Sequence, residues 1–170
     1  MCTGALSKIY TLPGWRCGWL IVYNRHNYFD NVLVNLSLQS AILLHPCSLV
    51  QYALPKILKE VPDSYFAEFR AKIKDTSSYA FEKLQGIRAI KPTKANAAMY
   101  MMVAFDVNEF KDIKDTEDFA IKILEEECVL LFPSEVFFAK GFFRIILCTK
   151  KETIDSFVER LTRFCAAHYK

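Results

Sequence analysis

The sequence is constrained most strongly by an apolar run near its start, Gly18 to Tyr23, which reads GWLIVY. β-Branched and aromatic side chains dominate this run, and Gly18 and Asn24 mark its ends, so it predicts a buried strand. A strand this apolar needs neighbours on both faces. The residues from Met1 to Thr3 are too short to form a strand by themselves. The run therefore predicts that this part of the chain belongs to a larger folded structure.

Length and composition set limits on the domain organisation and on the partners. The 170 residues include 52% hydrophobic and 24% charged residues, which is enough for one domain plus a fragment of another. The net charge is +3, and acidic and basic residues are interleaved, so we expect no nucleic-acid partner. No apolar run reaches the length of a membrane span, so we expect no membrane partner. We expect a cytoplasmic protein; an organelle-targeting segment would lie in missing N-terminal sequence.

Hydrophobic periodicity predicts helices in the first half of the chain and a small mixed domain in the second. The last helix is expected to begin with a capping box formed by Thr149 and Glu152. Gly86 is expected to cap the third helix at its C-terminus. The expected helices are 28–44, 47–61 with Pro55 inside, 64–85, 116–127 and 150–167, and the expected strands after the third helix are 87–90, 98–105, 129–132 and 142–147.

Two basic residues near the apolar strand are candidates for chemistry. Lys8 lies in a stretch containing Gly, Ala and Ser, where partial desolvation would favour the neutral, nucleophilic amine. Arg16 follows the Pro13-Gly14 turn, where its guanidinium could form two parallel hydrogen bonds to a phosphate. Taken singly, Lys8 is explained as a solvated surface lysine and Arg16 as a structural ion-pair residue. The occurrence of Lys8 and Arg16 together in one short segment favours a functional site.

Arg144 lies inside the apolar run Phe142 to Leu147. Burying a guanidinium without a partner costs several kcal/mol, so such an arginine normally meets a carboxylate. That carboxylate is either structural or part of a ligand, and the residues leave both alternatives open.

The order K-x-x-x-x-P-G-W-R-x-G-W, which runs from Lys8 to Trp19, resembles the pyridoxal-phosphate aminotransferases of fold type I, and especially the tyrosine aminotransferase group. The resemblance covers essentially the whole chain. It implies an α/β to α+β fold, in which residues 1–61 are the end of the cofactor-binding large domain with connecting helices, and residues 62–170 are a long helix and the small C-terminal domain. Further matching segments are His45 to Gln51, Ala98 to Met102, Phe142 to Leu147 and Arg163 to Tyr169.

The resemblance also implies roles for single residues. Lys8 would form the Schiff base with pyridoxal 5'-phosphate and shuttle a proton at the substrate α-carbon. Arg16 would bind the cofactor phosphate, and Arg144 would grip the substrate α-carboxylate. No metal site is expected.

The implied reaction is transamination of an aromatic, tyrosine-like L-amino acid with a 2-oxo acid, by a homodimer. Family members hold further cofactor contacts upstream of the lysine, so we expect these 170 residues to be inactive alone. Two alternatives stay open: a non-catalytic remnant or interaction module, and a related fold-type I lyase or synthase.

Several residues outside these motifs have plainer interpretations. Ala97 stands where the family has a glycine, which predicts strain or a shifted loop if that glycine needs a positive φ. His168, like His26 and His45, is expected at the surface or at a helix end. The run Glu125 to Glu127 is expected to form a solvated face. The six cysteines include no C-x-x-C pair, which predicts reduced thiols, most of them in apolar surroundings.

Overall fold

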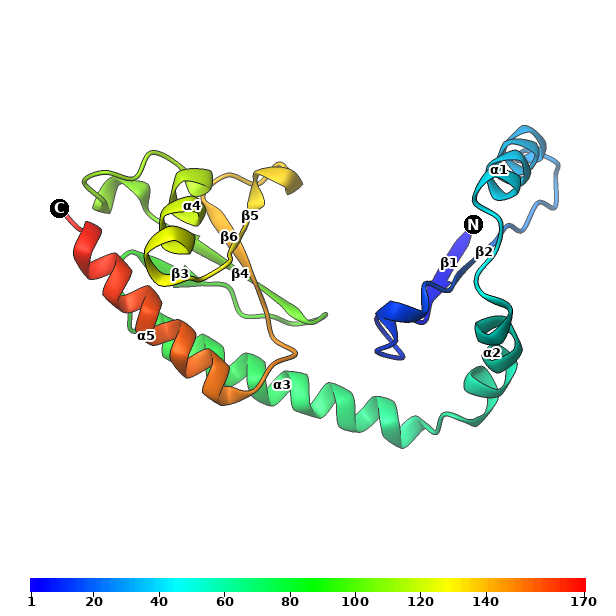
Figure 1. Ribbon diagram of the computed structural model, residues 1–170, viewed down its shortest axis with the longest axis horizontal. Coiled ribbons are helices and arrows are strands. Elements are labelled where there is room, and N and C mark those ends of the chain that lie inside the picture. Colours follow the sequence, from blue (N-terminus) through cyan, green and yellow to red (C-terminus); the bar gives the residue numbers. More distant parts are fainter. The chain divides into compact units, whose positions relative to one another are not determined.

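The computed structural model describes residues 1–170, except for the side chain of Leu43. The chain folds into two compact units, residues 1–66 and 67–170, and each is described by itself. Figure 1 labels the elements along the chain. The first unit contains β1 (Cys2–Ala5), η1 (Pro13–Trp15), β2 (Gly18–Ile21), α1 (Asp30–Leu43), α2 (Ser48–Glu60) and the start of α3 (Asp63–Gln85). The second contains the rest of α3, β3 (Ile90–Pro92), β4 (Tyr100–Phe105), η2 (Val107–Glu109), α4 (Thr116–Glu127), β5 (Phe132–Pro133), η3 (Ser134–Phe137), β6 (Phe142–Ile146) and α5 (Lys151–His168).

In the first unit, β1 and β2 form an antiparallel pair in which Gly4 lies opposite Trp19. A Cβ atom on Gly4 would come within 2.5 Å of the Trp19 ring, so a side chain at this position would displace the indole. The expected strand is present, but its burial is not: Leu20 is 39% and Ile21 58% exposed. Among the described residues only β1 pairs with β2, so much of the apolar surface of β2 stays exposed in this unit.

Helices α1 and α2 lie close to their expected positions, and α2 continues through Pro55. Both helices carry large apolar side chains in solvent, since Ile42 is 81%, Leu49 79% and Tyr52 89% exposed. Across the described residues, no helix is long and apolar enough to cross a membrane.

The second unit is built on an antiparallel sheet in the order β3-β4-β6-β5. Successive side chains of a strand point to opposite faces, and on β4 and β6 alternate residues are buried. The buried face packs in one core with side chains of α3, α4 and α5. Ion pairs from Asp75 to Lys151 and from Lys83 to Asp155 join α3 to α5. The strand residues of this core are Ile90, Met101, Val103, Phe105, Phe143 and Ile145.

Some local expectations are wrong. Strand β3 begins at Ile90, because residues after α3 first form turns in which Ile87 N–H donates to Leu84 O and Ile90 N–H to Ile87 O. Gly86 does not adopt the left-handed conformation of a helix cap. The expected capping box is absent, since Lys150 is the N-cap of α5 and its side chain makes no capping bond. Glu152 is then one position too early in the helix for a capping box.

Candidate active site

Lys8 and Arg16 lie in one closed loop that runs from Leu6 to Cys17. Leu6 N–H donates to Cys17 O at 3.1 Å, and Leu12 N–H donates to Leu6 O at 3.1 Å. The Leu6 side chain is fully buried and Cys17 is 4% exposed. These apolar ends anchor the loop, whereas Lys8 and Arg16 are exposed. The local structure therefore presents both basic side chains from one anchored segment.

Arg16 adopts a left-handed conformation, with φ 49° and ψ 39°, at the end of η1. That conformation costs an L-residue roughly 1–2 kcal/mol, and strain of this kind is typical of functional loops. Its Nη1 donates to Pro13 O at 3.3 Å. Among the described side chains, Arg16 takes part in no ion pair. A guanidinium has five N–H donors, so most of them remain for an anion.

Lys8 lies in the turn that precedes η1, and Thr11 N–H donates to Lys8 O at 3.2 Å. The first turn of α3 holds this part of the loop. The hydroxyls of Tyr65 and Thr11 lie 2.7 Å apart, and the ring of Tyr10 packs on Phe66 with 5.4 Å between centroids. The turn that contains Lys8 is thus held by contacts of its neighbours Tyr10 and Thr11 with α3, which lies far along the chain.

The loop fits the chemical groups of pyridoxal phosphate. A phosphate needs a cation with several N–H donors, which Arg16 has, and an aldehyde needs a primary amine, which Lys8 has. Both residues come from one short segment, the loop from Leu6 to Cys17.

Arg144 occupies β6, one of the two inner strands, on the face opposite the core. Its cross-strand partners are Met102 on β4 and Phe132 on β5. Tyr100 lies two residues before Met102, which is the diagonal position that a long side chain reaches across a sheet. The register of three strands therefore surrounds Arg144 with neighbours from both sides.

Three aromatic rings enclose the Arg144 guanidinium. Its Cζ lies 4.4 Å from the ring centroid of Tyr100, 4.6 Å from that of Phe132 and 4.9 Å from that of Phe137. The rings of Phe132 and Phe137 also contact each other at 5.6 Å. Aromatic faces attract a cation and hold the guanidinium plane in position.

Arg144 is half-buried, yet no carboxylate of the described residues forms an ion pair with it. Its aromatic neighbours supply no negative charge that could pair with it. Of the two alternatives raised by the sequence, a structural carboxylate and a ligand carboxylate, this environment favours the ligand.

The loop before β4 contains strain one residue later than the sequence indicates. Ala98, not Ala97, has a positive φ, at 62°. Leu147 N–H, directly after β6, donates to Met99 O at 2.8 Å. Ala98 therefore lies directly before the residue at which the chain begins to pair with the end of β6. The strained residue lies in the segment that leads into β4, the strand whose Tyr100 contacts Arg144.

Sequence reasoning missed the three rings around Arg144, because Phe132 and Phe137 lie outside the matched segments. Strand alternation gave one available signal, since Tyr100 and Arg144 both fall on the half-buried face. His168 lies at the end of α5, which is one of its two expected positions, but it is only 7% exposed and contacts Asp112 and Glu126. The solvated face expected for Glu125 to Glu127 is wrong for Glu127, which is buried and forms two hydrogen bonds with Arg163.

Several known proteins are similar to this chain. Residues 1–161 match the family described as aminotransferase class I and II. A tyrosine aminotransferase of Dictyostelium discoideum is 34% identical over 98% of this chain and 41% of its own length. A cystine lyase of Arabidopsis thaliana is 29% identical over 97% of this chain and 40% of its own length.

A solved structure of tyrosine aminotransferase from Leishmania infantum shares 25% identity and a TM-score of 0.88, covering 99% of this chain and 41% of that chain. This chain thus spans about two-fifths of the length of these relatives. Its fold is that of the C-terminal portion of a fold-type I aminotransferase. The chain belongs to the class I and II aminotransferase family.

Proposed function

We propose that this chain supplies the cofactor lysine, the phosphate-binding arginine and the carboxylate-binding arginine of a pyridoxal-phosphate aminotransferase. The substrates are an aromatic, tyrosine-like L-amino acid and a 2-oxo acid. The observation that carries the proposal is Arg144, a half-buried guanidinium held by three aromatic rings with no ion-pair partner among the described residues. We assign residues 1–61 to the cofactor-binding domain and residues 62–170 to the small domain.

Each side chain has a physical task. Pyridoxal phosphate, when bound, provides a conjugated ring that accepts electrons from the substrate α-carbon. Arg16 binds the phosphate and orients the cofactor. Lys8 would hold the cofactor through its Nζ amine, and the same amine would move the proton at the substrate α-carbon. Arg144 would bind the α-carboxylate in a fixed plane, which would orient the substrate.

The aromatic surroundings of Arg144 support an apolar or aromatic substrate. Phe132 is 44% and Phe137 46% exposed, so parts of these rings remain accessible beside the guanidinium. An aromatic side chain of a substrate would bury apolar area against these rings.

A related lyase is the second candidate, because the cystine lyase is similar over nearly the whole chain. The two reactions are distinguished by their products in the complete protein. With tyrosine and 2-oxoglutarate, we expect the 2-oxo acid of tyrosine and glutamate in equal amounts. With cystine, release of pyruvate and ammonia without transfer to 2-oxoglutarate would favour the lyase.

The cofactor site is testable on these 170 residues directly. Borohydride reduction makes the link between a lysine amine and pyridoxal phosphate permanent, and mass spectrometry of peptides then locates it. We expect preferential modification of Lys8 over Lys56, an exposed lysine of α2, and loss of this preference in Arg16→Gln. Equal modification of both lysines would contradict the cofactor assignment. Transamination itself is expected only from the complete architecture.

We also propose that the complete enzyme is a homodimer. The exposed apolar side chains of α1 and α2 support this, because large apolar surfaces on soluble proteins usually contact other protein. Sedimentation of the complete protein tests it: a monomer at micromolar concentration would contradict the proposal.

A further inference from the structure

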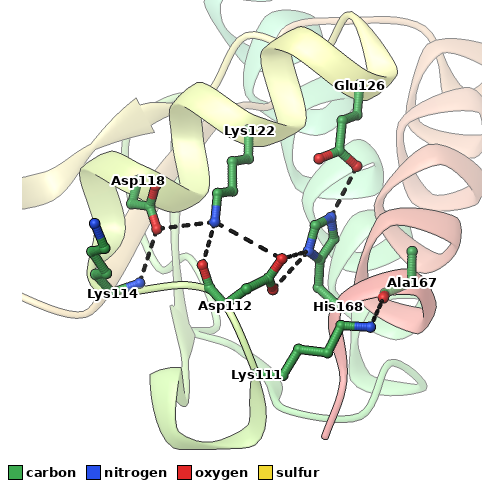
Figure 2. A network of polar contacts seen from close by, with 8 residues as sticks. All are labelled: Lys111, Asp112, Lys114, Asp118, Lys122, Glu126, Ala167 and His168. Atoms are coloured by element: carbon green, nitrogen blue, oxygen red, sulfur yellow. Dashed lines mark hydrogen bonds and ion pairs between the residues drawn. The ribbon is translucent and has the colours of Figure 1, made fainter.

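His168 lies in the last turn of α5, and both of its ring nitrogens contact carboxylates (Figure 2). Nδ1 lies 2.8 Å and 2.9 Å from the two carboxylate oxygens of Asp112, and Nε2 lies 2.9 Å from Oε2 of Glu126. The imidazole is only 7% exposed. Asp112 precedes α4 and Glu126 lies in the last turn of α4, so one ring joins three segments of the second unit.

Counting protons determines the charge of this cluster. An ionised carboxylate only accepts hydrogen bonds, and a neutral imidazole has only one N–H. Contacts on both nitrogens therefore require either an imidazolium or a protonated carboxyl. The hydrogen bond from His168 lowers the pKa of Asp112, so that carboxyl stays ionised. The hydrogen bonds to Glu126 and Asp112 raise the pKa of His168, which favours the extra proton on the imidazole.

The direction of the His168 pKa follows from two opposing effects. Burial is the largest single effect and lowers the pKa of His168, but the hydrogen bonds to Glu126 and Asp112 together outweigh it and raise the pKa above its usual value. The ring of Phe164 packs against the imidazole with 4.3 Å between centroids. This apolar neighbour limits access of water on that side of the ring.

Other charged groups surround the cluster. Lys122 on α4 forms ion pairs with Asp112 at 4.0 Å and Asp118 at 3.4 Å. Lys111 Nζ donates to Ala167 O at 2.7 Å (Figure 2). Cys165 on α5 and Tyr169, the C-cap of α5, are titratable neighbours in the sequence. Burial raises the pKa of each to about 12, so both stay neutral through the range in which His168 titrates.

Backbone hydrogen bonds beside the cluster join the last residues of the chain to the segment before α4. Lys111 N–H donates to His168 O at 3.0 Å, and Lys170 N–H donates to Glu109 O at 3.1 Å. The Phe110 ring stacks on Tyr169 with 5.3 Å between centroids. Loosening His168 would therefore loosen the C-terminal residues together with the segment before α4.

We propose that His168, Asp112 and Glu126 form a proton-dependent clamp that fastens the end of α5 to α4 and to the segment before it. When the imidazolium loses its proton, only one nitrogen can still donate, and one carboxylate is left facing a lone pair. The folded state raises the pKa of His168, so the stabilisation is complete below the unfolded value of about 6.5. It is lost as the pH rises through the higher folded pKa.

An NMR titration of the imidazole resonances tests this clamp in the intact chain. The exposed side chains of His26 and His45 provide reference titrations in the same spectra. We expect His168 to keep its proton to a higher pH than either reference. We expect the amide protection of Lys170, corrected for intrinsic exchange, to fall over the His168 titration. A titration at or below the pH of the references would overturn the clamp.

Two matched variants isolate the carboxylate. Glu126→Gln removes the partner of Nε2, whereas Glu125→Gln makes the same charge change at the neighbouring exposed position. We expect the His168 midpoint to fall by about one pH unit in Glu126→Gln and to change much less in Glu125→Gln. Equal shifts would mean that net charge, not the contact, sets the protonation. If Glu126→Gln does not fold, the titration of the unaltered chain decides alone.

Discussion

Phe132 lies directly opposite Arg144 in the β5–β6 register, with its ring centroid 4.6 Å from the guanidinium carbon. β5 is only two residues long, so this one pair accounts for half of its pairing with the sheet. The short strand brings an aromatic face to the arginine that we propose as the carboxylate ligand. We therefore expect a substitution of Phe132 to change substrate binding.

Replacing Phe132 with Leu should weaken substrate binding in the complete aminotransferase. A cation–π contact at a partly exposed site contributes about 0.5–1 kcal/mol, so we expect KM for both substrates to rise roughly two- to five-fold, with a smaller change in kcat. Phe138→Leu is the matched control, because Phe138 is fully exposed in the same segment. An equal effect in both variants would show that Phe132 does not act through Arg144.

The core of the second unit should be sensitive at Phe119. This residue is fully buried, stacks on Phe143 at 5.6 Å and packs edge-on against Phe164 at 5.1 Å. Phe119→Ala leaves a cavity and should cost about 3–5 kcal/mol in the free energy of urea unfolding. Ile121→Ala, on the exposed side of the same helix, should cost much less. Comparable losses would argue against the packing described for α4.

Cys128 ends α4 in a left-handed conformation, with φ 53°. Glycine adopts this conformation without a Cβ clash and is the usual residue at such a helix end. Cys128→Gly should therefore raise the free energy of unfolding by about 1 kcal/mol. Cys148→Gly, at an exposed cysteine without a positive φ, should not stabilise. Thermal and urea unfolding of the two variants measure the difference, and stabilisation of both would remove the conformational explanation.

The cysteines should differ in reactivity. Burial raises the pKa of Cys165 to about 12, so at pH 8 its thiolate fraction is on the order of one in ten thousand. Cys2, Cys47, Cys128 and Cys148 are exposed. Brief alkylation of the native chain at pH 8, read by peptide mass spectrometry, should label the exposed thiols and spare Cys165. Rapid labelling of Cys165 would mean that α5 opens readily.

The sequence predicted the elements whose own residues specify them. Helix 116–127 is present as expected, and the strand 142–147 is formed over Phe142–Ile146. Both have a clear apolar period, which local geometry converts directly into a helix or a strand. The ends are less accurate: Gly86 and the Thr149–Glu152 pair do not cap their helices as expected. Capping depends on the residue at which tertiary packing starts or stops a helix.

For the candidate site too, some features could be predicted from the sequence and others could not. The sequence by itself determined the family, the loop that carries Lys8 and Arg16, and the presence of Arg144 in an apolar strand, because these depend on residue order over short distances. Only the tertiary structure decided what surrounds each residue. Tyr100 and Phe132 meet at Arg144 through strand register, and Phe137 reaches it from η3. Asp112 and Glu126 meet at His168. Such contacts join residues up to 56 positions apart, and no local pattern specifies them, since they arise only when the sheet and helices pack into one core.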